Sequence, residues 1–285
     1  MSHITAGIAA ETTAAGIAAK TGTGTAGECA AEVTVGAARV PYRVRGAGRP
    51  LVLVHGTNRG SASWDGLAGA FAEDRTVVLP DLSGSDAARD DGGPLTVELL
   101  AGQLAAVLSA HGQGPADVVG HSMGAPVAAA CAALRPDLVR RLVLVAGFAG
   151  QGDEYLRNVL TLWRGLEGDA AAFARYAMLF AFSREHVNSL GRAAVEELAA
   201  AYRVTPGRLR QLDLDLRLDV RGLLPQIQAP TLVIGCARDT LVPVAHSREL
   251  AAAIPGAAYR EVDSGHLVTV ERPAELVRLV RDFAG

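Results

Sequence analysis

The chain has 285 residues, a formal net charge of −3 and 49% hydrophobic residues, the composition of a globular protein. There is no basic excess to neutralise phosphates, which argues against nucleic-acid binding, and no apolar run reaches the roughly 18 residues of a membrane span. The three cysteines, Cys29, Cys131 and Cys236, are far apart in the sequence. We therefore expect reduced thiols, no metal site and a cytoplasmic protein.

The first part of the chain is mostly Ala, Gly and Thr. It offers few large side chains to bury, so residues 1–30 are predicted to form a flexible tail. A docking helix or an arm exchanged between subunits is the alternative, and a homo-oligomer is left open. The segment has neither the charged start nor the long apolar stretch of a secretory signal.

Alternating apolar and polar residues next predict an antiparallel hairpin over Glu32–Val35 and Arg39–Arg45. Short apolar runs separated by helical stretches then indicate an α/β fold with a mostly parallel, eight-stranded sheet covered by helices on both faces. The further strands are expected at Leu51–Val54, Thr76–Leu79, Asp117–Val119, Leu142–Ala146, Thr231–Ile234 and Tyr259–Val262. The helices between them are expected at Ser63–Ala72, Thr96–His111, Met123–Leu134, Ala245–Ala252 and Pro273–Phe283.

The alternation of strands and helices stops between Gly147 and Leu224, where the pattern is helical. The helices are expected at Asp153–Leu166, Ala170–Phe182, Arg184–Leu190, Ala193–Val204 and Pro206–Leu212. We predict a helical lid over residues 148–220, inserted into a core formed by residues 31–147 and 221–285. Leucines alternate with charged residues over Leu212–Asp219, which suggests an extended segment that returns to the sheet.

The strongest local motif is Gly120-His121-Ser122-Met123-Gly124, which follows an apolar strand and opens a helix. G-x-S-x-G in this setting is a nucleophile elbow, a tight turn that exposes the serine hydroxyl. Glycines flank the serine because a Cβ there would clash with the neighbouring strand or helix. The sequence therefore predicts Ser122 as a nucleophile.

A serine hydroxyl needs an adjacent base, and His266 follows the last predicted strand. Asp239 follows the strand Thr231–Ile234 and is predicted to orient the histidine. The chain order Ser122, Asp239, His266 is the one found in this kind of site. Asp263 lies nearer to His266 in the sequence, but we expect it to serve the turn.

The transition state of acyl transfer needs two donors for its oxyanion. We predict the backbone amides of Met123, at a helix N-terminus, and of Thr57, in the loop after the strand Leu51–Val54. The side chains of Thr57 and Asn58 either face the substrate or shape the turn. Large side chains gather in and beside the predicted lid, so Phe148, Trp163, Tyr176 and Phe180 are predicted to line an apolar pocket, with ordinary helix packing as the alternative.

Five short motifs follow one another along the chain, and their order and spacing are what carries a family resemblance. They are His55-Gly56, Pro80-Asp81-Leu82, Gly120-His121-Ser122-Met123-Gly124, Ala237-Arg238-Asp239 and Gly265-His266. From about residue 32 onward, the chain resembles the α/β-hydrolase superfamily, in its lidded esterase, lactonase and perhydrolase branch. The resemblance implies hydrolysis of an ester, lactone or thioester through an acyl-enzyme, with a small acyl substrate and no cofactor. It also implies a structural role for Asp81.

Some features of the sequence narrow this resemblance. Ser122 stands where haloalkane dehalogenases and epoxide hydrolases place an aspartate, and Ser83-Gly84-Ser85 replaces a usual Arg-Gly-His-Gly stretch. A carbon–carbon bond hydrolase, a lyase or a perhydrolase on the same fold is one alternative. A non-catalytic binding protein is another.

Overall fold

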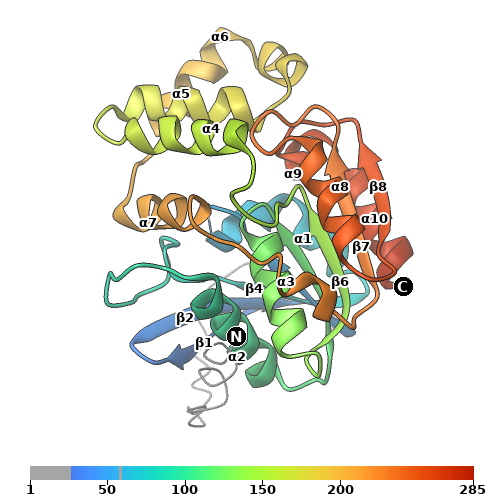
Figure 1. Cartoon of the computed structure of the whole chain (residues 1–285). Coiled ribbons are helices and arrows are strands. Elements are labelled where there is room, and N and C mark those ends of the chain that lie inside the picture. The colour runs from blue at the N-terminus through green and yellow to red at the C-terminus, as the bar shows by residue number, and fades with distance from the viewer. Residues whose placement is uncertain (1–26, 58–59) are drawn as a thin grey trace.

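A computed structural model describes residues 27–57 and 60–285. The predicted tail, up to residue 26, and Asn58 lie outside the described residues. The described chain forms one sheet with helices on both faces and a helical group beyond one end of the strands (Figure 1). Its strands are β1 (Glu28–Val35), β2 (Ala38–Arg45), β3 (Arg49–Val54), β4 (Arg75–Pro80), β5 (Ala116–His121), β6 (Val139–Val145), β7 (Thr231–Cys236) and β8 (Ala258–Val262).

The sheet has the strand order β1-β2-β4-β3-β5-β6-β7-β8. The pairs β1–β2 and β2–β4 are antiparallel and the remaining pairs are parallel, which confirms the predicted mostly parallel sheet. Glu28 already pairs with Arg45, so the hairpin begins inside the segment predicted as a tail. Because the strands β3 to β8 run in the same direction, the loops after their carboxyl ends meet at one edge.

Helices cover both faces of the sheet. They are η1 (Gly60–Trp64), α1 (Asp65–Phe71), α2 (Val97–His111), α3 (Gly124–Leu134), α4 (Glu154–Gly165), α5 (Ala170–Ala181), α6 (Arg184–Ala201), α7 (Pro206–Asp215), η2 (Leu224–Gln226), α8 (Val244–Ala253), α9 (Val268–Glu271) and α10 (Pro273–Ala284). Leu100 of α2, Val127 of α3 and Leu250 of α8 belong to one apolar core. Phe71 of α1 and Val280 of α10 belong to the core on the other face. None of the described helices has the length and apolar content that a membrane crossing needs.

The helices α4 to α7 form an insertion between β6 and β7 (Figure 1). Each begins after a capping side chain that accepts a backbone N–H of the first turn: Asp153, Asp169, Ser183 and Thr205. Such caps satisfy donors that the helix itself leaves unpaired, and they explain why the predicted helix starts agree with the structure. Gly191 has a φ of +76° inside α6, at the predicted break between two helices.

The extended segment expected over Leu212–Asp219 is wrong for its first half, because α7 continues to Asp215. At its other end, Asp219 forms an isolated antiparallel bridge with Gly150. Arg208, Gln211, Leu212 and Asp215 are all buried, and their spacing of three and four residues is that of one helical face. Three of these four side chains are polar. The polar residues on the buried face hid the helical period, so that only the alternating leucines stood out.

Candidate active site

Ser122 lies in the turn between β5 and α3 with a φ of +56°, a left-handed conformation that is costly for a residue with a side chain. Its amide donates to the carbonyl of Val145 at 3.0 Å, which ties the turn to β6. A Cβ on Gly120 would collide with the carbonyl oxygen of Gly124, and one on Gly124 would lie 2.5 Å from that of Val54. Both glycines are therefore required by the close approach of α3 to β5 and β3, as the motif predicts.

His266 and Asp239 lie in the loops after β8 and β7, at the same sheet edge as Ser122. His266 Nδ1 donates to Asp239 Oδ2 at 2.7 Å, and its Nε2 accepts from Ser122 Oγ at 2.9 Å. The other carboxylate oxygen of Asp239 accepts the amides of Leu241 and Val242 at 2.9 and 2.8 Å. The structure thus brings the three predicted side chains into one hydrogen-bonded chain, in which the imidazole is placed to take the serine proton.

Asp263, the other carboxylate near His266 in the sequence, points elsewhere. It forms an ion pair with Arg238, which also pairs with Glu185 of α6 at 2.9 Å. This pairing lowers the pKa of Asp263 and links the loop that holds Asp239 to the insertion. Asp263 therefore serves the loop, as expected.

The loop after β3 passes directly against the nucleophile. A Cβ on Gly56 would lie 2.8 Å from Ser122 Cβ and 3.4 Å from Ser122 Oγ, so the loop that carries Thr57 packs against the serine. His55 is fully buried and fixes the conformation of this loop through two hydrogen bonds. Its Nδ1 donates to the Gly56 carbonyl at 2.8 Å, and its Nε2 accepts a hydrogen bond from the Leu82 amide at 3.0 Å. On the other side of the turn, Met123 directly precedes α3, where amide groups face a developing negative charge.

Asp81 lies beneath the same loop. It accepts the amide and the hydroxyl of Ser61 at 2.8 and 2.7 Å and has no contact with Ser122 or His266 among the interactions of the described residues. Its contacts are those of a residue that shapes a loop.

His121 precedes the serine and packs behind the site. Its Nε2 donates to the His266 carbonyl at 3.0 Å, and its ring lies 5.0 Å from the His266 ring, between centroids. Burial, and then the nearby charge of His266, lowers the pKa of His121 to about 3. It is therefore neutral at physiological pH and braces the His266 loop, a role that the motif alone did not reveal.

Asp215, the last residue of α7, is a site residue that the sequence reasoning missed. It is 4% exposed, and Thr57 Oγ1 donates to its Oδ2 at 2.5 Å. Burial raises the pKa of this carboxyl to about 7, although the Thr57 hydrogen bond and the charge of His266 act to lower it. The signal that could have found it is the buried helical face of α7, which the alternating leucines obscured.

The aromatic residues predicted to line a pocket pack mainly on one another. Trp163 lies 5.4 Å from Phe173, and Tyr176 stacks on Phe180 at 4.5 Å, again between centroids. The Tyr176 hydroxyl donates to the Val159 carbonyl at 2.8 Å. Phe148 is buried in the core that contains α3. The Trp163–Phe173 contact joins α4 to α5, and the Tyr176–Phe180 stack lies within α5. A substrate contact of any of these four predicted residues stays a prediction.

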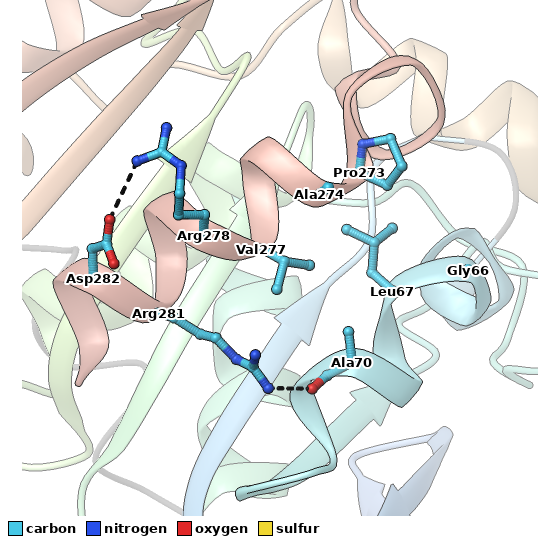
Figure 2. A pocket seen from close by; sticks show the side chains of 9 residues that line it. All are labelled: Gly66, Leu67, Ala70, Pro273, Ala274, Val277, Arg278, Arg281 and Asp282. Atoms are coloured by element: carbon cyan, nitrogen blue, oxygen red, sulfur yellow. Dashed lines mark hydrogen bonds and ion pairs between the residues drawn. The ribbon is translucent and has the colours of Figure 1, made fainter.

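Two recesses lie on the described surface away from Ser122. One, of about 520 Å³, lies between α1 and α10, where Arg281 reaches the Ala70 carbonyl at 2.6 Å (Figure 2). The other, of about 210 Å³, lies between α6 and the loop after β7 and is bordered by Phe182 and Thr240. Within residues 27–57 and 60–285, no three His, Cys, Asp or Glu side chains gather in a group that could hold a metal ion.

Comparison with known proteins places this geometry in context. The profile of the family described as "alpha/beta hydrolase fold" matches residues 49–273. A pyrrolizixenacetamide deacetylase from Xenorhabdus hominickii is 39% identical over 257 residues, which are 88% of this chain and 97% of that protein. A 2-hydroxymuconate semialdehyde hydrolase from Pseudomonas putida is 30% identical over 273 residues, with 90% and 94% covered.

A solved structure supports the same fold. The crystal structure of an enol-lactonase from Burkholderia xenovorans superposes with a TM-score of 0.80 at 24% identity, covering 89% of this chain and 99% of that one. At this identity the similarity shows the fold alone.

Proposed function

Because this chain belongs to the alpha/beta hydrolase fold family, we propose that it is a serine hydrolase that cleaves a small acyl compound through an acyl-enzyme on Ser122. The observation that carries the proposal is the hydrogen-bonded chain from Asp239 through His266 to Ser122 Oγ. The carboxylate holds the imidazole with Nδ1 protonated, which leaves Nε2 free to take a proton from the serine.

The proposed cycle has two halves. Ser122 Oγ attacks the acyl carbonyl while His266 Nε2 takes its proton, and the amides of Thr57 and Met123 bind the oxyanion. Loss of one such donor typically reduces the rate by about 10²–10³-fold. His266 then protonates the leaving group, and in the second half it takes a proton from the water that releases the acyl group. Asp239 stays ionised and stabilises the imidazolium.

The proposed substrates are esters, lactones or thioesters of a small apolar acid, as the resemblance to the α/β-hydrolase superfamily implies. The relative that is 39% identical is named a deacetylase of an acetamide, and the same relay can release an amine if His266 protonates the nitrogen. We therefore add small N-acyl amines to the candidate substrates. Asn58, Phe148, Trp163, Tyr176 and Phe180 stay proposed as substrate contacts.

The test is turnover of p-nitrophenyl acetate and butyrate, together with fluorophosphonate labelling. Wild-type protein should hydrolyse both esters and take one label, while Ser122→Ala should lose both properties. Ser109→Ala is the matched control and should behave as wild type, because among the described residues the Ser109 hydroxyl bonds only to the Ala105 carbonyl of its own helix.

Two other functions would give different results. A same-fold enzyme for carbon–carbon cleavage, favoured by the similarity to the Pseudomonas putida hydrolase, would be silent on the esters but labelled at Ser122. A non-catalytic binding protein would show neither turnover nor labelling.

A further inference from the structure

The loop of the proposed oxyanion hole is bound to the insertion through a buried acid. Thr57 Oγ1 and Asp215 Oδ2 are 2.5 Å apart, and this single hydrogen bond joins the loop after β3 to the end of α7. Gly56 packs against Ser122, and Thr57 follows it, so the Asp215 carboxyl contacts the residue proposed to supply an oxyanion amide. The charge of His266 acts to lower the pKa of Asp215, so the protonation of this carboxyl is linked to the proposed base.

Two buried acceptor atoms in this cluster have no donor. Asp215 Oδ1 and Gln151 Oε1 are both buried without a hydrogen-bond partner among the described residues. The Gln151 amide group donates through Nε2 to the backbone carbonyl of Asp215, which fixes its orientation and leaves Oε1 as an acceptor. Buried polar atoms are nearly always paired in native proteins. These two acceptors without a donor, on residues joined by the Gln151–Asp215 hydrogen bond, therefore indicate a ligand that brings an N–H or O–H group.

We propose that Asp215 Oδ1 and Gln151 Oε1 form an acceptor subsite that binds the amide N–H of an N-acyl substrate. This inference rests on the proposed function and narrows its substrate class to secondary carboxamides. The linking oxygen of an ester carries no hydrogen and leaves both acceptors unpaired. The amide nitrogen carries one, so the subsite distinguishes the two kinds of acyl compound.

The first test uses two probes that differ only in the linking atom, p-nitroacetanilide and p-nitrophenyl acetate. The quantity measured is the ratio of kcat/KM for the anilide to that for the ester. Asp215→Leu removes the acceptor at similar volume and should lower this ratio by about ten- to a hundredfold, the usual effect of losing a hydrogen bond to a charged group. Asp215→Asn keeps one carbonyl acceptor and should restore part of the ratio.

The matched control is Asp213→Asn on the same helix, whose carboxylate is 39% exposed and pairs with Arg164. It should leave the ratio unchanged. Gln151→Met is a second variant for the case in which Asp215→Leu does not fold, and it should lower the ratio in the same direction.

A pH series separates recognition from a purely structural role. Asp215 carries its charge above a pKa of about 7, and a carboxylate is a stronger acceptor than a carboxylic acid. The anilide-to-ester ratio of the wild type should therefore rise through pH 7 and become flat in Asp215→Asn. His266 is the charged group of the described residues that acts on Asp215. It serves both substrates as base, so its contribution divides out of the ratio.

The outcomes distinguish the two proposals. A protein without fluorophosphonate labelling at Ser122 contradicts the proposed function. Labelling and ester turnover overturn the present inference if the wild type does not hydrolyse the anilide, or if Asp215→Leu slows both substrates equally. The latter result would mean that Asp215 only anchors α7 to the Thr57 loop.

Discussion

Substitution of Gly56 by Ala tests how closely the loop after β3 supports the nucleophile. The added Cβ would lie 2.8 Å from Ser122 Cβ, whereas unstrained carbon atoms stay about 3.5–4.0 Å apart. The two nearest atoms are the Ser122 Cβ and the backbone carbonyl oxygen of His121, at 3.1 Å, and neither belongs to a flexible side chain. The loop or the serine must therefore move by about 0.7–1.2 Å.

Either movement damages the proposed catalytic geometry. If the serine yields, its 2.9 Å hydrogen bond to His266 lengthens beyond hydrogen-bonding range. If the loop yields, the Thr57 amide leaves the oxyanion position. A misplacement of about 1 Å can cost about 10²-fold in rate, so we expect kcat/KM for p-nitrophenyl acetate to fall by about that factor.

The assay compares Gly56→Ala with Gly66→Ala, a position in α1 where a Cβ meets nothing within 4 Å. Both variants should stay folded by circular dichroism, since overpacking typically costs about 1–3 kcal/mol. The control should keep wild-type activity. A folded Gly56→Ala protein with activity within threefold of wild type, roughly 0.6 kcal/mol, would refute this reasoning.

Three further predictions concern the acid, the core and the thiols. Asp239→Asn should lower kcat for p-nitrophenyl acetate by about 10⁴-fold, because Asn favours the imidazole tautomer of His266 that cannot take the serine proton; an effect below tenfold would argue against the orienting role. Asp117 is 1% exposed and bonded by two arginines, so Asp117→Ala should lower the free energy of unfolding in urea by about 3–5 kcal/mol, the cost of leaving buried charges unpaired. An unchanged midpoint would contradict this. Cys29 is exposed, whereas burial raises the pKa of Cys131 to about 12, so a disulfide reagent should modify Cys29 in the native protein and all three cysteines after denaturation.

The sequence predicts the central part of this fold because local and global signals agree there. Two valines, Val118 and Val119, lead into the glycine-flanked Ser122. The strand that contains them, β5, is buried along its whole length. A parallel sheet needs strands that are buried on both faces, so such runs are reliable strand signals. The same topology brings the loops after different parallel strands to one edge of the sheet. A contact between Ser122 and His266 can therefore be predicted from the strands that each residue follows, although the two are far apart in the sequence.

What the sequence does not reveal depends on contacts between distant side chains. Asp215 looks like a solvated residue in an alternating stretch, and only its burial against Thr57 makes it part of the site. The rings of Trp163 and Phe173 are visible as part of an aromatic cluster, but their contact depends on how α4 packs on α5. Glu28 joins a strand because Arg45 lies opposite it, a pairing that composition cannot show.

The central claim, an acyl-enzyme on Ser122, can be tested by rapid acid quench of the protein during turnover of p-nitrophenyl acetate, followed by mass spectrometry of its peptides. In the wild type, the peptide that contains Ser122 should carry one added acetyl group. The corresponding peptide of Ser122→Ala should carry none. Steady turnover with no acetylated peptide, or with the acetyl group on another residue, would contradict it.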